Sequence, residues 1–130
     1  HMTHREWFAL DQQRDRYRRA WAEFFEECDL LLCPAAASTA FVHDHEGERP
    51  DRTIDIEGSQ EPVVDQLFWA GWSCSVYLPS TVAPVGLLDE LPVGLQIVAP
   101  HLQDRRSIQF ASLIERELGG FVAPPGFETI

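Results

Sequence analysis

The chain of 130 residues contains no lysine. All ten of its basic residues are arginine, so the chain alone offers no lysine as a catalytic base, a Schiff-base partner or a Walker-type phosphate ligand. Basic charge is also scarce, because 21 acidic residues bring the formal net charge to −11. A chain of this sign repels phosphate backbones and lacks a basic membrane-binding face. We therefore expect neither nucleic acid nor a membrane as a partner.

Long apolar runs and disulfide patterns are missing too. No apolar run approaches the roughly 18–20 residues of a membrane span, and no basic stretch followed by an apolar one marks a secretory signal. The three cysteines have no Cys-x-x-Cys spacing. An odd number of such residues fits buried thiols in a reducing compartment better than a disulfide framework. These features predict a cytoplasmic protein.

The N-terminal part of the sequence predicts a helix followed by a strand. His1-Met2 (residues 1–2) is interpreted as an expression-tag remnant, which leaves residues 3–130 for the fold. Thr3 and Glu6 have the spacing of a capping box. Apolar residues then recur at helical intervals up to Asp29, which predicts a long amphipathic helix. The fully apolar residues 30–33 predict a strand in the interior of a sheet.

The middle of the chain, residues 34–60, shows neither a helical nor a strand period. It predicts a long loop, and loops beyond ~12–15 residues are usually functional or disordered. Pro62 is expected to be the first residue of a helix whose apolar face runs to Trp72. That helix carries Trp69 and Trp72 three residues apart, a spacing that suits core packing or a ligand cage.

The C-terminal half predicts a hairpin and a final helix. Strands are expected over 81–87 and 92–99, joined by a turn at Asp89-Glu90, and Asp104 is expected to cap the last helix. The element order indicates an α/β fold with mixed β-sheet strands flanked by helices. Three strands are few for such a sheet, which usually has ~5–6. The fold is therefore predicted to be incomplete on its own, and an excised piece of this kind is expected to self-associate.

The densest set of functional groups is His43-Asp44-His45-Glu46. Two imidazoles and two carboxylates can bind zinc or carry out acid–base chemistry. On an extended segment, however, His43 and His45 point to one side and the carboxylates to the other, which leaves a tetrahedral site short of ligands. A solvated acidic loop is the competing interpretation. No serine stands in a Gly-x-Ser-x-Gly elbow, and no serine or cysteine lies beside a histidine, so no self-sufficient catalytic centre is predicted. No cofactor is predicted, and two histidines alone do not predict a metal site.

Two segments carry a more specific pattern, residues 78–86 (LPSTVAPVG) and residues 91–100 (LPVGLQIVAP). Together they resemble the C-terminal sheet region of the amidase signature family, and three further stretches resemble that family in the same order. These are residues 24–35 (FFEECDLLLCPA), residues 40–45 (AFVHDH) and the last helix with its tail from Leu102 to Gly126. Glu90 departs from the pattern, because a glycine is usual there, and this predicts a stiffer or longer turn.

The resemblance implies that residues 3–130 are the C-terminal segment of an amidase signature domain. The family's Ser–cis-Ser–Lys triad lies N-terminal to such a segment, so no catalytic residue is carried over to this chain. The parent is expected to hydrolyse a non-peptide carboxamide to a carboxylate and ammonia or an amine. Its expected partners are the remainder of the parent chain and a small amide substrate. Phe41, His43 and Trp69 are predicted to form part of the substrate-pocket wall.

Other classes of function stay open at this point. A stand-alone binding or scaffold module descended from an amidase would begin naturally near Thr3 and form a stable monomer or closed dimer. A small metal-dependent protein would centre on His43 and His45 and bind stoichiometric zinc. The parent could also belong to an amidotransferase rather than being an amidase.

Overall fold

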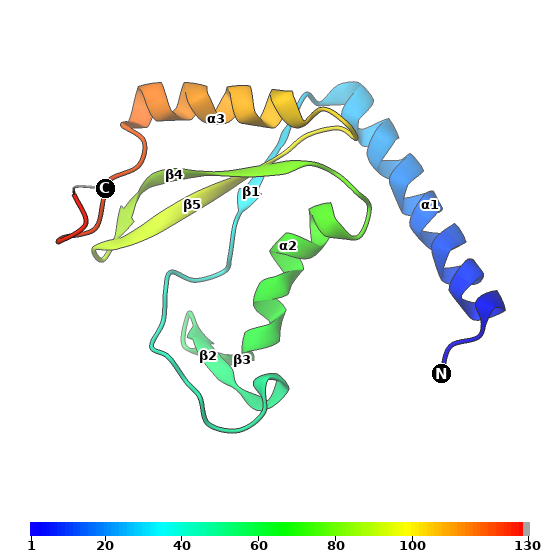
Figure 1. Ribbon diagram of the computed structural model, residues 1–130, viewed down its shortest axis with the longest axis horizontal. Helices are drawn as coiled ribbons and strands as arrows, with labels where there is room; N and C mark the ends of the chain where they lie inside the picture. Colours follow the sequence, from blue (N-terminus) through cyan, green and yellow to red (C-terminus); the bar gives the residue numbers. More distant parts are fainter. Residues whose placement is uncertain (129–130) are drawn as a thin grey trace.

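The computed structural model describes residues 1–128 and shows a small antiparallel sheet with helices on both sides (Figure 1). The predicted 3–130 unit therefore reaches two residues beyond the described part of the chain. The sheet has the strand order β1-β5-β4, formed by β1 (Leu31–Pro34), β5 (Leu91–Val98) and β4 (Ser80–Leu88). Both strand pairs are antiparallel, so the expected mixed sheet is wrong. The pattern of apolar residues predicts strands, but their direction depends on which distant segments pair.

The first helix, α1 (His4–Glu27), begins as the sequence predicts. The backbone N–H of Thr3 donates to Glu6 Oε2 at 2.7 Å, and the Glu6 N–H donates to Thr3 Oγ1 at 3.3 Å. These reciprocal bonds are a capping box, which satisfies donors that the first helical turn leaves unpaired. The C-terminal turns of α1 pack against the core through Trp21 and Phe25, and Figure 1 shows the N-terminal end of the helix projecting away from the sheet.

Strand β1 lies at one edge of the sheet and pairs with β5 alone within the described residues. The expectation that residues 30–33 lie inside a sheet is therefore wrong for this structure. The hairpin strands β4 and β5 accommodate proline at positions without a strand neighbour on one side. Within residues 1–128, Pro84 lies in edge strand β4, and Pro92 lies in the part of β5 that pairs only with β4. Proline lacks a backbone N–H, so it is tolerated where no ladder bond is needed.

The segment after β1 is not a featureless loop. It contains a short 3-10 helix, η1 (Arg49–Asp51), and a hairpin of β2 (Thr53–Ile56) and β3 (Ser59–Pro62). Pro62 ends β3, then η2 (Val63–Gln66) leads into α2 (Leu67–Cys74), so the helix starts five residues later than predicted. The hairpin turn is Glu57-Gly58, and both residues have positive φ. A two-residue turn of this kind suits the twist of the strands.

The β4–β5 hairpin matches its prediction within one residue at all four strand ends. Its turn, Asp89-Glu90, has φ values of 50° and 65°. The turn is therefore no longer than the usual two residues, and Glu90 adopts a left-handed conformation that favours glycine. Gly94 is required for a different reason. A Cβ atom at this position would lie 2.7 Å from Val82 Cγ1 on the neighbouring strand, which is too close for any other residue without a local shift.

Two layers cover the sheet. Helix α3 (Asp104–Leu118) lies along one face, where Thr81 Oγ1 and the buried Ser107 Oγ are 2.9 Å apart (Figure 1). Gln103, rather than the predicted Asp104, occupies the N-cap position of α3. On the other face, Val76, Leu78 and Val98 form the core cluster, and Trp21 and Phe25 of α1 pack against it. The layers are thus α3, the sheet, and then α1 with α2.

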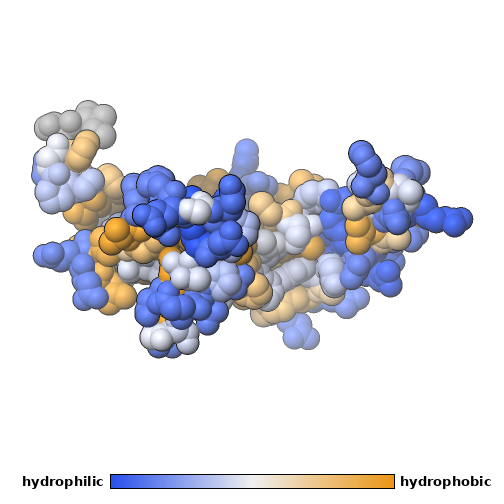
Figure 2. Space-filling view, turned by 90° about the horizontal axis from the view of Figure 1, so that it is seen from below, coloured by the Kyte–Doolittle hydropathy of each residue, from blue (hydrophilic) through white to orange (hydrophobic). Residues whose placement is uncertain are grey.

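Many large apolar side chains are exposed to solvent. Trp7 and Leu10 on the projecting part of α1 are each about half exposed, at 50% and 52%, and Tyr17 farther along the helix is 54% exposed. Figure 2 shows apolar surface exposed beside hydrophilic side chains. Monomeric proteins usually cover such contiguous patches. No helix within residues 1–128 is both long and apolar enough to cross a membrane.

Candidate functional site

A strongly apolar hollow lies between α1, α2 and strand β1. We call it the aromatic groove, and it has a volume of about 500 Å³. Its lining consists almost entirely of aromatic and aliphatic side chains: Tyr17, Ala20, Trp21, Phe24, Leu31, Cys33, Trp69 and Trp72. Concave apolar hollows of this size are typical of sites for small organic molecules.

The aromatic groove is shaped by edge-to-face ring packing. The Trp21 and Trp72 ring centroids are 5.4 Å apart with an interplanar angle of 78°, and this contact joins α1 to α2. Trp72 also packs edge-on against Phe68 at 5.3 Å. The indole Nε1 of Trp72 is buried and has no hydrogen-bond partner within residues 1–128. An unpaired buried donor is costly, so nonpolar contact rather than hydrogen bonding holds this indole in place.

The position of Trp69 is fixed by a buried polar contact. Gln96 on the central strand is 4% exposed, and its side-chain Nε2 donates to the Trp69 carbonyl oxygen at 3.2 Å. Sequence reasoning missed Gln96. Its only signal was a polar residue within the otherwise apolar strand 93–98, where neighbouring Ile97 and Val98 are fully buried.

The three predicted wall residues do not surround one cavity. Trp69 lines the aromatic groove, whereas Phe41 lines a separate hollow of about 520 Å³ beside the β2–β3 hairpin. His43 lines neither of these two hollows, and its ring lies 5.7 Å from that of His45. Within residues 1–128 no group of three or more histidines, cysteines and carboxylates is placed to hold a metal ion. The imidazole pair therefore gives the zinc hypothesis no further support.

The cysteines do not form a nucleophilic centre. Burial raises the pKa of the Cys33 thiol, which keeps it protonated and weakly nucleophilic at neutral pH. Cys28 and Cys74 are exposed, so the expectation of buried thiols is wrong for both. All three cysteines are free in the described part of the chain.

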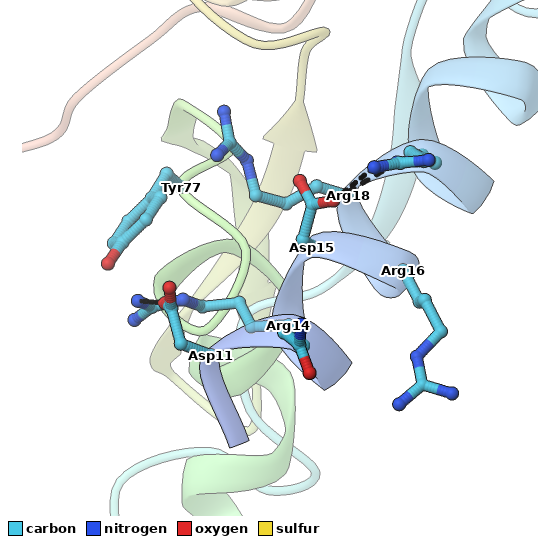
Figure 3. Close-up of a pocket in the computed structure, with 8 residues that line it drawn as sticks. Asp11, Arg14, Asp15, Arg16, Arg18 and Tyr77 are labelled. Atoms are coloured by element: carbon cyan, nitrogen blue, oxygen red, sulfur yellow. Dashed lines mark hydrogen bonds and ion pairs between the residues drawn. The ribbon is translucent and has the colours of Figure 1, made fainter. Parts of the chain in front are cut away.

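A second, polar hollow of about 620 Å³ lies between α1 and Tyr77 (Figure 3). We call it the arginine hollow, and its lining residues are Asp11, Gln12, Arg14, Asp15, Arg16, Arg18, Arg19 and Tyr77. The guanidinium carbons of Arg14 and Arg18 lie 4.7 Å and 5.6 Å from the centre of the Tyr77 ring. These are cation–π contacts, and they attach α1 to the turn before β4.

Comparison with known proteins assigns the family. Residues 1–108 match the family described as Amidase. The chain therefore belongs to the amidase signature family, as the LPSTVAPVG and LPVGLQIVAP segments predict.

Two curated relatives illustrate the match. The indoleacetamide hydrolase of Bradyrhizobium japonicum is 28% identical over 113 residues, which cover 87% of this chain and 23% of that protein. A glutamyl-tRNA(Gln) amidotransferase component of Tropheryma whipplei (strain TW08/27) is 34% identical over 113 residues, covering 87% of this chain and 20% of the relative. The chain thus spans about a fifth to a quarter of the length of these relatives.

Solved structures share the fold. A bacterial aryl acylamidase of the amidase signature family superposes with a TM-score of 0.70 at 23% identity, covering 88% of this chain and 23% of that one. A further amidase structure gives a TM-score of 0.70 at 18% identity and covers 91% of this chain and 26% of its own length. The antiparallel sheet with its flanking helices is therefore an arrangement also found within these amidase structures.

Proposed function

We propose that residues 3–130 are the C-terminal segment of an amidase that hydrolyses a non-peptide carboxamide to a carboxylate and ammonia or an amine. The observation that carries this proposal is the family match over residues 1–108, combined with coverage of only 20–23% of the two curated relatives. The chain has no lysine, so the lysine of the Ser–cis-Ser–Lys triad must lie outside these residues. The chain alone is therefore inactive.

The segment's contribution is to complete the sheet and to form part of the substrate-binding wall. The free edge of β1 and the exposed apolar face of α1 are the surfaces that the rest of the enzyme covers. Covalent acyl transfer needs a largely dry cavity with fixed oxyanion donors. Trp69, whose backbone carbonyl is bound by Gln96, supplies an aromatic surface for that cavity. Phe41, which lines the separate hollow beside the β2–β3 hairpin, and His43, which lines neither hollow, contribute to the wall once the rest of the enzyme closes around the segment.

An aromatic carboxamide is the substrate class that we favour. The aromatic groove is almost without polar surface, so it suits a neutral ring better than a charged or aliphatic polar group. Two of the similar proteins carry names that refer to aromatic amides, indoleacetamide hydrolase and aryl acylamidase. The match to an amidotransferase component favours a second candidate function, action on a tRNA-linked amide. The net charge of −11 speaks against this candidate, because it repels a polyanion.

The test compares the product of the complete reading frame with the present chain. We expect the complete product to release ammonia from indole-3-acetamide and phenylacetamide, and the present chain to release none. Trp69→Ala, Phe41→Ala and His43→Ala in the complete product should change the preference for aromatic over aliphatic amides. Trp7→Ala, outside the aromatic groove, is the matched control. Ammonia release by the present chain would refute the proposed division of labour, and unchanged preferences in all three variants would refute the wall assignment.

A further inference from the structure

The charges of the arginine hollow are unevenly compensated. Arg14 forms an ion pair with Asp11, and Arg19 pairs with Asp15 at 2.7 Å. Arg18 lies between these pairs and is half-buried, yet within residues 1–128 no carboxylate lies at ion-pair distance from it. Arg16 on the same helix is exposed and likewise has no ion pair in the described chain. Four arginines against two aspartates leave the lining positive in a chain whose net charge is −11.

The surroundings of Arg18 hold its guanidinium in place. His101 Nδ1 lies 2.9 Å from the Tyr77 carbonyl oxygen, which can only accept, so Nδ1 carries the proton. In the neutral imidazole, Nε2 is then the acceptor, and Arg18 Nη2 lies 3.4 Å from it. The ring of Tyr77 packs against the same guanidinium. One nitrogen of Arg18 is thus engaged, while its other N–H donors have no side-chain acceptor in the described chain.

The backbone around this contact is strained. Tyr77 has φ 62° and Leu102, next to His101, has φ 63°. Left-handed conformations of this kind are sterically unfavourable for residues other than glycine, and such strain clusters at ligand-binding sites. Here it brings the Tyr77 ring against two arginines one helical turn apart, Arg14 and Arg18, whose like charges repel each other.

We propose that the arginine hollow is a binding site for a small oxyanion, a carboxylate or a phosphate group, with Arg18 as its principal ligand. Two oxygens of such a group match the planar fork of a guanidinium, and a negative charge relieves the repulsion between Arg14 and Arg18. The site lies on the polar side of α1, whereas the aromatic groove contacts Tyr17, Trp21 and Phe24 of that helix. It does not depend on the proposed amidase activity.

The test is a titration of the present chain, labelled with 15N-arginine, at constant ionic strength and at a concentration where light scattering gives the mass of one chain. Because the chain has no lysine, the arginine Nε–Hε signals report its strongly basic side chains. Inorganic phosphate and acetate are compared, with chloride as the control anion. We expect saturable chemical-shift changes of the Arg18 and Arg14 signals with at least one of the two oxyanions and none with chloride. The oxyanion that binds more tightly identifies the ligand class. Linear drifts shared by all arginines would overturn the proposal.

Variants separate the site from general electrostatics. Arg18→Gln should weaken binding about tenfold or more, whereas Arg116→Gln on α3 removes the same charge and should leave binding unchanged. Arg18→Lys keeps the positive charge but lacks the planar guanidinium fork, so it should weaken binding by an intermediate factor. If circular dichroism shows that Arg18→Gln loses helix, Arg18→Lys takes its place in the comparison. Equal weakening in the Arg18 and Arg116 variants, or wild-type affinity in Arg18→Lys, would contradict the assignment.

Discussion

The side chain of Gln96 donates a hydrogen bond of 3.2 Å to the backbone carbonyl of Trp69 and thereby joins the central strand of the sheet to α2. Gln96 is almost fully buried, at 4% exposure. A buried amide in an apolar strand is stabilising only when its polar atoms are paired. The contact therefore fixes the position of α2 and of the tryptophans that line the aromatic groove.

Replacing Gln96 should show how much this bond matters. Gln96→Glu places a carboxylate against the Trp69 carbonyl, and we expect the free energy of unfolding to fall by about 2–3 kcal/mol at pH 7. Gln96→Met removes the bond without adding a charge and should cost only about 1 kcal/mol. Because burial raises the pKa of the introduced carboxyl, protonation near pH 4–5 should restore part of the lost stability. Equal losses for both variants at pH 7, measured by urea denaturation, would contradict this role.

The Asp89-Glu90 turn offers a stabilising substitution. Glu90 has φ 65°, a conformation that glycine adopts without steric cost. Glu90→Gly should therefore raise the free energy of unfolding by about 0.5–1 kcal/mol, after allowing for the greater entropy of glycine in the unfolded chain. Glu90→Ala is the matched control, because alanine meets the same steric conflict as glutamate and should bring no gain. A glycine variant no more stable than the alanine variant would show that the turn is not strained.

The start of α1 should respond to pH through Glu6. The backbone N–H of Thr3, and then its hydroxyl, donate to the Glu6 carboxylate and lower its pKa below the ordinary 4.5. A lowered pKa means that the ionised form stabilises the folded state. This contribution is complete above about pH 5 and is lost as the pH falls through the lowered folded value. Hydrogen exchange of the first-turn amides should accordingly show fraying as the pH approaches 3, after correction for intrinsic rates.

Two variants test that interpretation. Glu6→Gln retains a capping-box acceptor without a titrating group, so its helix start should depend much less on pH over the same range. Thr3→Ala should return the pKa of Glu6 toward its ordinary value, as followed by the carboxyl carbon shift. An unchanged Glu6 pKa in Thr3→Ala would show that the capping box does not cause the shift.

Self-association is expected from the exposed apolar face of α1 and the free edge of β1. Light scattering after size exclusion should give a mass that rises with concentration above the 14.8 kDa of one chain. Leu10→Asp, on the projecting part of α1, should lower that mass. Val42→Asp introduces the same charge at a loop residue that is 90% exposed and should not. A constant monomer mass for the unaltered chain would count against this prediction.

Local signals in the sequence predicted the elements that local chemistry determines. The Thr3–Glu6 capping box marks the start of α1, and the apolar strands on either side of Asp89-Glu90 mark the β4–β5 hairpin. The β2–β3 hairpin was missed because each strand has only four residues. Strand β2 alternates polar and apolar residues (TIDI), but this pattern is too short to be distinctive, and β3 (SQEP) is entirely exposed and shows no such alternation. The Glu57-Gly58 turn is a further sign of a hairpin, but without recognised strands on either side a Gly-containing pair of this kind indicates only a loop.

Features that depend on distant residues could not be predicted. The antiparallel pairing of β1 with β5 joins Leu31 to Val98, which lie 67 positions apart in the chain. No local sequence pattern predicts whether two such distant strands pair parallel or antiparallel. The approach of Trp21 to Trp72, which creates the aromatic groove, likewise depends on how α1 packs on the sheet. Trp69 was recognised as a candidate wall residue, but Gln96, which holds it, was not.

The central claim is that this chain completes an amidase whose catalytic triad lies upstream, and the most direct measurement is the gene sequence before the codon for Thr3. We predict that the reading frame continues upstream for several hundred codons and encodes a lysine followed by a glycine- and serine-rich stretch. A start codon with a ribosome-binding site immediately before Thr3 would contradict the proposed function. The chain would then be a separate protein without a triad, and a binding or scaffold role would replace the proposed hydrolase.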